Sequence, residues 1–355
     1  MTDAEQSDDA RPTEPPGPAL SVVIVTHDSS AALPESLPPL VAQLRDGDEL
    51  IVCDNASADG TPALARELAP AATVIDAGGN LGFAAGCNLG AARARNDLLL
   101  LLNPDVVVAT GFRDAIELPL TEGRGWGAWQ GLVTADGGAR INTSGGAVHF
   151  TGIAWAGGAG SPREEAPAEP REIPFASGAC LAVRREVWEE LGGFSEPYFL
   201  YHEDADLGLR LWLAGHRVGL EPRAVCDHDY EFRKGGYKWR YLERNRWATV
   251  LRAYPPRLLA LLWPGLIATE LALLAVATLG GWLPQKLRAD LEVIRWLPRL
   301  RRERAAIQAG ARIEPARFAS LLGSGLESAH LGRAAGSPLL RRLLAGYWRA
   351  VLRLL

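Results

Sequence analysis

The chain has 355 residues, of which 48% are hydrophobic and 22% are charged, and its formal net charge is −5. These ordinary values exclude a wholly disordered or fibrous protein. The charge is unevenly spread, because residues 285–355 hold 14 Lys and Arg against 5 Asp and Glu. This segment carries +9 and the preceding 284 residues carry −14. An acidic body and a basic C-terminal tail therefore need separate explanations.

The start of the chain and the spacing of the cysteines each allow one prediction. Residues 1–18 contain five acidic residues, four prolines and almost no apolar side chain, so we expect residues 1–19 to be a disordered leader. The four cysteines form no CxxC pair, which argues against a metal cluster or a disulfide scaffold and predicts free thiols. They are Cys53, Cys87, Cys180 and Cys226.

From Leu20 onward, short apolar runs of strand length alternate with segments of helical periodicity. The predicted strands are 21–26, 49–54, 72–76 and 97–102, and the predicted helices are 32–45, 61–68 and 83–95. Each strand is apolar throughout, as in a sheet that is buried on both sides. The pattern predicts an α/β fold in which a mostly parallel sheet has helices on both faces.

The middle of the chain, 123–172, is rich in Gly, Ala and Pro. We expect strands at the sheet edge there, followed by a flexible loop at 157–170. The two edge strands are predicted at 126–133 and 147–155. Further on, the pattern predicts strands at 177–183, 216–220 and 224–226 and helices at 184–191 and 203–214. After Tyr230 the chain becomes helical, aromatic and basic.

Polar side chains follow three of the predicted strands. They are Thr26, His27 and Asp28 after the first strand, Asp54 and Asn55 after the second, and Asn103 and Asp105 after the fourth. Ligands of doubly wound sheets bind at these carboxyl ends. Helix capping would explain one such residue, but three neighbouring strand ends favour a binding site. The chain lacks GxGxxG after the first strand, GxxxxGK[ST] and GxSxG, so dinucleotide oxidoreductases, ATPases and serine hydrolases lose their signatures.

An ordered series of motifs resembles the family 2 glycosyltransferases, in particular their rhamnosyltransferase-like branch. The motifs are 22–29, 52–61 (VCDNASADGT), 79–90 (GNLGFAAGCNLG), 102–105 (LNPD), 175–180 (FASGAC), 192–194 (GGF), 201–207 (YHEDADL), 227–232 (DHDYEF) and 242–246 (LERNR). The resemblance covers residues 20–254. It implies a GT-A fold, which is Rossmann-like, and inverting transfer of a sugar from a nucleotide-sugar donor.

The resemblance also implies donor-binding residues. Asp54 would contact the nucleotide base, and Thr26 and His27 would line the same pocket, although family members usually have Tyr-Asn in place of His27 and Asp28. The other implied contacts to the nucleotide sugar are Asn55, Asn80, Gly82, Phe83, Asn88 and Asn103. Glycines let the backbone approach a ligand, and a helix N-terminus favours an anion.

Asn103-Pro104-Asp105 occupies the position of the family's DxD metal motif. A diphosphate leaving group calls for a divalent cation, Mg or Mn, and such ions prefer carboxylate oxygens. Asp105 would supply that carboxylate. His228 matches a histidine that completes the metal site in some relatives, and a hydrogen-bonded structural histidine is the alternative.

The catalytic base is expected within Glu203-Asp204-Ala205-Asp206. A single-displacement transfer needs one carboxylate near the acceptor hydroxyl to take its proton. By the family correspondence Asp204 is the base, and Glu203 and Asp206 lie near the metal or the acceptor. The alternative is that these acids only complement the first turn of a helix.

Residues 243–247 (ERNRW) resemble the QxxRW motif of processive polysaccharide synthases, with Glu in place of Gln. Those enzymes place their sheet domain between transmembrane helices. We expect none ahead of the domain here, and therefore a non-processive enzyme that adds a single sugar.

Residues 258–283 are almost wholly apolar, interrupted by Pro264, Glu270 and several glycines. This length reaches the roughly 20 residues that cross a bilayer. A single crossing would place the basic tail opposite the catalytic domain, whereas short basic flanks prefer the cytoplasmic side. We therefore expect the helical tail, 255–355, to be peripheral or re-entrant, with basic amphipathic helices at 290–300 and 341–355 on anionic lipid. A soluble helical cap is the alternative.

The expected partners are a nucleotide-sugar donor, a lipid-linked glycan acceptor and the cytoplasmic membrane surface, and no nucleic acid. Rhamnose is the first candidate for the sugar, from a dTDP donor. Two other functions are compatible with the same fold: a nucleotidyltransferase, and a catalytically silent membrane scaffold.

Overall fold

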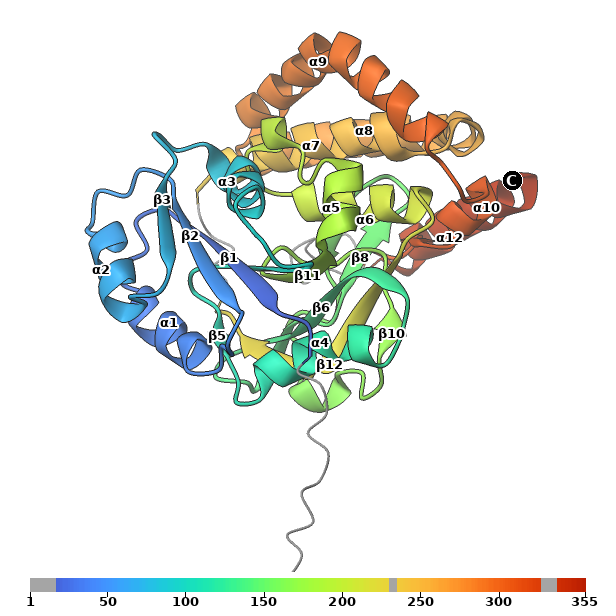
Figure 1. The fold of residues 1–355 in the computed structure, drawn as a ribbon. Coiled ribbons are helices and arrows are strands. Elements are labelled where there is room, and N and C mark those ends of the chain that lie inside the picture. The colour runs from blue at the N-terminus through green and yellow to red at the C-terminus, as the bar shows by residue number, and fades with distance from the viewer. Residues whose placement is uncertain (1–16, 230–234, 327–336) are drawn as a thin grey trace, which may run out of the picture.

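The structure is a computed structural model that describes residues 17–229, 235–326 and 337–355. Most of the expected leader, 1–16, and the end of the motif at 227–232 lie outside the described residues. The alternation predicted for residues 20–102 is present (Figure 1). Its strands are β1 (Leu20–Thr26), β2 (Glu49–Asp54), β3 (Thr73–Asp76) and β4 (Leu98–Leu102), and its helices are α1 (Leu33–Val41), α2 (Thr61–Leu68) and α3 (Gly82–Ala91). The four strands are parallel, in the order β4-β1-β2-β3.

Beyond β4 the sheet becomes mixed rather than mostly parallel. The added elements are β5 (Val107–Val108), α4 (Phe112–Thr121), β6 (Trp126–Ala135), β7 (Arg140–Thr143), β10 (Arg171–Glu172), β11 (Cys180–Arg184), α5 (Arg185–Leu191), η2 (Glu196–Tyr198), α6 (Glu203–Leu213) and β12 (Arg217–Asp227). The full order is β10-β12-β6-β11-β4-β1-β2-β3. β11 runs antiparallel to both β4 and β6, and β6 is parallel to β12.

Two expectations for the strands of this sheet are corrected. β6 is an interior strand and not an edge strand, and all its residues except the last are buried. A Cβ at Gly131 would lie 2.3 Å from the Ala224 carbonyl oxygen, so a glycine there permits the close pairing of β6 with β12. The strands predicted at 216–220 and 224–226 are one strand, β12, with a register shift between Glu221 and Val225.

The segment 147–155 forms a hairpin outside the main sheet. Its strands are β8 (Gly146–His149) and β9 (Ala154–Ala156), and β13 (Leu322–Gly323) pairs with β8 to give a separate three-stranded sheet. Between β9 and β10 lies the short 3₁₀ helix η1 (Arg163–Glu165). The hairpin contributes one wall of the site described below.

Helices cover both faces of the main sheet, as predicted (Figure 1). One buried apolar cluster joins alternate residues of β1, such as Val22, to α1, α2 and α4. The residues between them, such as Val23, join α3, α5 and α6 on the other face. This alternation follows from the two-residue period of a strand. All four cysteines are buried and free.

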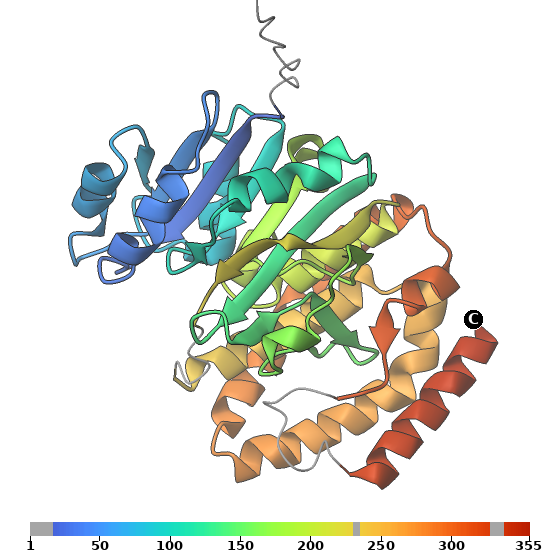
Figure 2. The same cartoon turned by 90° about the horizontal axis from the view of Figure 1, so that it is seen from below.

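The C-terminal helices are α7 (Tyr237–Ala253), α8 (Pro256–Leu279), α9 (Leu283–Ala309), α10 (Pro315–Ala319) and α12 (Pro338–Leu354). α7 packs along α9, and α8 lies beside α12 (Figure 2). A third apolar cluster connects α6, α8, α10 and α12 with the β8–β9 hairpin. Within it, Phe150 stacks on Trp348 with ring centroids 5.3 Å apart. The helices thus pack on the sheet domain through the α6 side and the hairpin.

Candidate active site

Two neighbouring cavities lie beside the carboxyl ends of the central strands. The strand-end cavity has a volume of about 380 Å³, and the α6 cavity has a volume of about 430 Å³. The strand-end cavity is lined by residues that include Thr26, His27, Asp28, Asn55, Asn80, Gly82, Asp105 and Phe199. The α6 cavity is lined by residues that include Asn142, Trp155, Ser177, Gly178, Tyr201, His202, Glu203, Asp204 and Tyr237. Both share Phe83, Asn103, Leu200 and His228 as lining residues.

The ends of β1 and β2 form one side of the strand-end cavity. His27 Nδ1 lies 2.8 Å from the Asn55 carbonyl oxygen. Asp54 is buried, and its carboxylate accepts hydrogen bonds from Thr26 Oγ1 (2.9 Å), Ser57 Oγ (2.5 Å) and Ser57 N (2.9 Å). Asp54 itself lines neither cavity, so these bonds hold its carboxylate inside the wall. Asp54 shapes this cavity mainly from behind its wall.

The N-terminus of α3 forms the opposite side. Asn80 Oδ1 accepts a hydrogen bond from Gly82 N (3.0 Å), and Asn55 Nδ2 donates to the Gly82 carbonyl (3.0 Å). Gly82 has φ +82°, and a Cβ there would lie 2.5 Å from Phe199, so glycine is required on both counts. Within the described part of the chain, the buried Asn55 Oδ1 has no hydrogen-bond partner. This wall therefore combines a helix N-terminus with a buried amide oxygen that has no described hydrogen-bond partner.

Besides Asp54, two residues expected at the site line neither cavity. The Asn88 side chain turns to the segment after α5, where Nδ2 donates to the Phe194 carbonyl (2.9 Å) and Oδ1 accepts from Phe194 N (3.0 Å). It lines neither cavity. These two bonds give Asn88 the role of joining α3 to residues 193–194.

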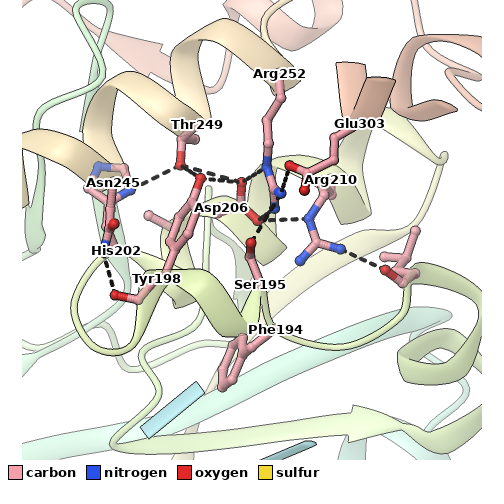
Figure 3. Close-up of polar contacts among 12 residues, drawn as sticks. Phe194, Ser195, Tyr198, His202, Asp206, Arg210, Asn245, Thr249, Arg252 and Glu303 are labelled. Carbon is pink, nitrogen blue, oxygen red and sulfur yellow. Dashed lines mark hydrogen bonds and ion pairs between the residues drawn. The ribbon is translucent and has the colours of Figure 1, made fainter. Parts of the chain in front are cut away.

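Asp206 is the second residue that the structure does not bring to the cavities. Its side chain is fully buried, and its carboxylate is paired with Arg210 on the next turn and with Arg252 of α7 (Figure 3). Tyr198 Oη also donates to it, at 3.1 Å. Burial alone would raise the pKa of Asp206, but the two guanidinium groups outweigh burial and hold it well below its usual range. Asp206 is an internal counter-ion and not an acceptor contact.

Asp105 and His228 meet where the two cavities join. His228 Nε2 lies 3.1 Å from Asp105 Oδ1, and Asn103 Nδ2 lies 3.5 Å from the same nitrogen. Two adjacent ligands of an octahedral ion at about 2.1 Å would be about 3 Å apart, so this oxygen and nitrogen suit a divalent cation. The described residues contain no group of three His, Cys, Asp or Glu that could hold a metal. A cation here would need further ligands from a bound substrate.

Asp204 and Glu203 begin α6 and face the α6 cavity. Gly178 N donates to Asp204 Oδ2 (3.2 Å), and Ala205 N donates to Asp204 Oδ1 (2.7 Å). Burial raises the pKa of Asp204 in spite of these two bonds. Burial, and then the charge of Asp204, raises the pKa of Glu203 well above its usual range. Carboxyl groups with pKa values shifted in this way are typical of functional sites.

Several lining residues of the α6 cavity had no signal in the sequence. Trp155 comes from β9, in a segment predicted as a plain edge strand, and Asn142 comes from β7. Asn142 Nδ2 donates to the His228 carbonyl (2.7 Å), which ties β7 to the Asp105–His228 pair. An aromatic ring beside a few polar groups is typical of small-molecule sites. Only the hairpin's position, packed over α6, shows that Trp155 belongs to the site.

Comparison with known proteins agrees with this geometry. The family model described as glycosyl transferase family 2 matches residues 21–192, and that of glycosyl transferase family group 2 matches residues 125–298. The N-acetylglucosaminyl-diphospho-decaprenol L-rhamnosyltransferase of Mycobacterium tuberculosis is 30% identical over 237 residues, which are 59% of this chain and 75% of the relative. The chain belongs to the family 2 glycosyltransferases. It is a rhamnosyltransferase-like member of them.

Solved structures support the GT-A fold. A mannosyltransferase of Pyrobaculum calidifontis, in complex with GDP-Man and Mn²⁺, aligns over 97% of this chain and 88% of its own, with a TM-score of 0.51 and 20% identity. GalNAc-T7 with UDP, GalNAc and Mn²⁺ aligns over 68% of this chain, with a TM-score of 0.56 and 17% identity. The chain spans about half the length of GalNAc-T7, at 49%. At these identities the likeness concerns the fold.

Proposed function

We propose that this glycosyltransferase is inverting and metal-dependent, and that it moves one sugar from a nucleotide-sugar donor to a lipid-linked glycan. The observation that carries the proposal is the junction of the two cavities. Asp105 lies on the strand-end side of the shared wall, and Asp204 lies on the α6 side. One carboxylate is thus available near a leaving diphosphate, and another near an incoming hydroxyl.

The donor would bind in the strand-end cavity. Its base would approach Thr26, His27 and Asp54, and its sugar would reach toward the shared wall. Asn55 and Gly82 support this placement, because both line this cavity and a glycine allows a ligand to approach the backbone closely. The mannosyltransferase neighbour was solved with a nucleotide sugar and Mn²⁺. A divalent cation, Mg or Mn, held by Asp105, His228 and the diphosphate would neutralise charge on the leaving group.

Asp204 would act as the base. The acceptor hydroxyl oxygen forms a bond to the anomeric carbon while its proton passes to Asp204, and the bond from that carbon to the diphosphate oxygen breaks. The nucleoside diphosphate leaves, and attack from the opposite side inverts the anomeric centre. Burial supports this role because it raises the pKa of Asp204 above that of an exposed carboxyl, which makes it a better proton acceptor.

The acceptor would bind in the α6 cavity. The mycobacterial relative is named for transfer of rhamnose to a lipid-linked N-acetylglucosamine. We propose the same classes of donor and acceptor here: dTDP-rhamnose and a saccharide on a polyprenyl diphosphate. A single transfer, without processive elongation, accords with a cavity of about 430 Å³, which suits a short saccharide.

The C-terminal helices would hold the catalytic unit, 20–254, on the cytoplasmic face of the membrane. α8 is the one helix of the described residues that is long and apolar enough to cross a bilayer. Only 11% of its most apolar 18-residue stretch is buried within the protein. Its exposed side includes Trp263, Ile267 and Leu271. Midway along α8, Glu270 is paired with Arg246 of α7 and Lys286 of α9. These ion pairs support a helix that lies along the domain in the lipid interface rather than across the membrane.

The test is transfer of labelled sugar from a panel of nucleotide sugars to membrane lipid, with Mg²⁺ or Mn²⁺. Asp204→Asn should retain donor binding and lose transfer. Full transfer by this variant would contradict the role of the base. Release of pyrophosphate instead of a nucleoside diphosphate would favour a nucleotidyltransferase, and donor binding without transfer by the wild-type chain would favour a silent scaffold.

A further inference from the structure

The segment Tyr198–His202, here called the γ-turn loop, separates the two cavities and leads into α6. Phe199 and Leu200 line the strand-end cavity, whereas Leu200, Tyr201 and His202 line the α6 cavity. Glu203 and Asp204 follow directly. The backbone of this loop therefore fixes where the proposed base lies relative to the donor side.

The γ-turn loop has an unfavourable backbone conformation. Phe199, Tyr201 and His202 all have positive φ, at 68°, 68° and 71°, and none is a glycine. Phe199 has ψ −63°, and Leu200 N donates to the Tyr198 carbonyl at 2.8 Å, which is the rare, strained form of γ-turn. L-residues avoid left-handed conformations, because Cβ clashes with the backbone. Such a loop keeps its shape only where its surroundings hold it.

Asn245 of α7 holds the loop from behind. Its side chain is fully buried, and Nδ2 lies within hydrogen-bond distance of three loop carbonyls: those of Tyr198 (3.1 Å), Leu200 (3.1 Å) and Tyr201 (2.7 Å). Arg244 Nε donates to Asn245 Oδ1 at 2.9 Å, which fixes the orientation of the amide. One side chain thus contacts three carbonyls of the loop, and its two N–H groups are shared among them.

Thr249, one turn further along α7, contacts the same loop through side chains (Figure 3). Its Oγ1 lies 2.9 Å from Tyr198 Oη and 3.4 Å from His202 Nδ1. His202 Nε2 lies 2.9 Å from the Gly152 carbonyl, so the ring is held from two sides. Positions four apart lie on one face of a helix, and Asn245 and Thr249 therefore act on the loop together.

The donor side of the loop has a separate anchor. The Phe199 carbonyl accepts a hydrogen bond from Ala84 N of α3 at 3.1 Å, and the Phe199 ring stacks on Tyr241 with centroids 5.5 Å apart. Neither contact involves Asn245 or Thr249. Loss of the Asn245 and Thr249 contacts should therefore disturb the segment before α6 more than the wall of the strand-end cavity.

We propose that Asn245 and Thr249 are positioning residues that hold the γ-turn loop in the strained conformation that directs Asp204 into the α6 cavity. The inference rests on the proposed role of Asp204. It assigns to Asn245, inside the 243–247 motif, the support of the loop that carries the base. Both residues contact the loop through hydrogen bonds, and neither lines either cavity.

The experiment compares Asn245→Ala, Thr249→Val and Gln308→Ala with the wild-type chain. Gln308 is a matched control because its Nε2 also donates to two carbonyls of α7, those of Arg252 and Ala253 at 3.1 Å each, but it lies at the other end of the helix. The measurements are kcat for sugar transfer, the Kd for dTDP-rhamnose with Mn²⁺, and hydrogen exchange of the amides of residues 199–205.

Asn245→Ala should lower kcat about 100-fold, because a shift of about 1 Å in a catalytic group has that effect, and should leave the donor Kd within about threefold. The isosteric Thr249→Val should lower kcat about tenfold, by loss of a buried hydrogen bond. Both should raise exchange at residues 199–205, and Gln308→Ala should change neither quantity.

A kcat within about threefold of wild type in both loop variants, or unchanged exchange at residues 199–205, would overturn the proposal. If Asn245→Ala fails to fold and binds no donor, Thr249→Val decides, since it conserves the shape of the side chain. If the wild-type chain transfers no sugar, the proposed function fails, and hydrogen exchange still decides whether α7 holds the loop.

Discussion

The two cavities of this enzyme are built in different ways. The strand-end cavity takes its polar groups from residues that directly follow β1, β2 and β4, so the parallel sheet itself brings them together. The α6 cavity is assembled from a strained loop, a hairpin outside the main sheet and a helix that follows the sheet domain. The first is a consequence of local strand order, and the second depends on packing between distant segments.

The same contrast occurs within one turn of α6. Asp204 faces the α6 cavity with only backbone donors as described partners, and burial raises its pKa. Asp206, two residues later, is enclosed with Arg210 and Arg252, which hold its pKa well below the usual range in spite of burial. Identical side chains therefore acquire opposite properties, one suited to accepting a proton and the other to remaining charged.

The largest expected effect is that of Asp204→Asn on transfer. Removal of a general base should lower kcat by roughly 10²- to 10⁴-fold. Asparagine keeps only one of the two backbone hydrogen bonds to this side chain, but burial also disfavours the charged form of Asp204, so the free energy of unfolding should fall by no more than about 1 kcal/mol. Single-turnover transfer and denaturant unfolding measure the two quantities. A marked loss of stability would show that Asp204 has a structural role like that of Asp206.

Asp206→Asn should give the opposite result, a loss of stability. Arg210 would lose its carboxylate partner and Arg252 would keep only Glu303, and breaking a buried ion pair typically costs about 3–5 kcal/mol. The matched control is Asp114→Asn, because Asp114 pairs with Arg45 at the exposed surface, where such a pair contributes about 0–1 kcal/mol. Equal effects of these two substitutions on the urea midpoint would contradict the role of Asp206 as an internal counter-ion.

The pH dependence follows from the direction of the same shift. The pKa of Asp206 is lower in the folded chain than the value of about 3.9 in an unfolded one. Its stabilisation is therefore fully present above pH ~4 and is lost as the pH falls through the folded pKa. The stability difference between the wild-type chain and Asp206→Asn should be largest near neutral pH and shrink below pH ~4.

The sequence was sufficient for the strand-end cavity because periodicity located the strands, and the sheet then placed Asn55, Asn103 and Asp105 at one edge. It was insufficient where a polar residue serves a distant partner. Asn88 contacts Phe194, and Asp206 contacts Arg252, across 106 and 46 residues. A motif singles out such a residue, but it does not show which distant segment the side chain contacts.

The charges of α7 show a second reason for the incomplete prediction. Residues after 230 are basic and aromatic, and no partner for the charges of α7 is evident in the sequence. In the structure Arg244, Arg246 and Arg252 are buried, and each is paired with a carboxylate. Hydropathy cannot separate a buried ion pair from a solvated charge, because it counts side chains one at a time. The placement of α7, and with it the γ-turn loop, required the packing itself.

Removal of the metal should affect the strand-end cavity more than the α6 cavity. We expect Asp105→Asn to weaken Mn²⁺-dependent donor binding by about 10- to 100-fold, as loss of a metal-site contact typically does. Calorimetric titration of dTDP-rhamnose, with and without EDTA, measures this effect. In EDTA the two proteins should bind the donor equally weakly. A difference that persists in EDTA would mean that Asp105 contacts the donor directly.

The exposed side of α8 offers a test of the tail that leaves both cavities intact. Leu271 is 65% exposed on the apolar face, and Leu271→Glu should lower binding to vesicles of anionic lipid about tenfold. Leu81→Glu is the control, because Leu81 is an exposed leucine of the sheet domain, at 43%. Equal vesicle binding by both variants and the wild-type chain would favour the soluble helical cap.

The smallest expected effect is that of Trp155→Ala on KM, and it tests which substrate binds in which cavity. Trp155 reaches the α6 cavity from the hairpin, away from the strand ends, so its ring can support only the ligand on that side. Trp155→Ala should raise the KM for the lipid-linked acceptor about three- to tenfold, the size of one aromatic contact, and leave the donor KM unchanged. Trp155→Phe should restore most of the affinity, since a flat apolar ring remains. If the donor KM rises instead, the assignment of the two cavities is reversed, and Asp204 would then face the donor rather than the acceptor hydroxyl.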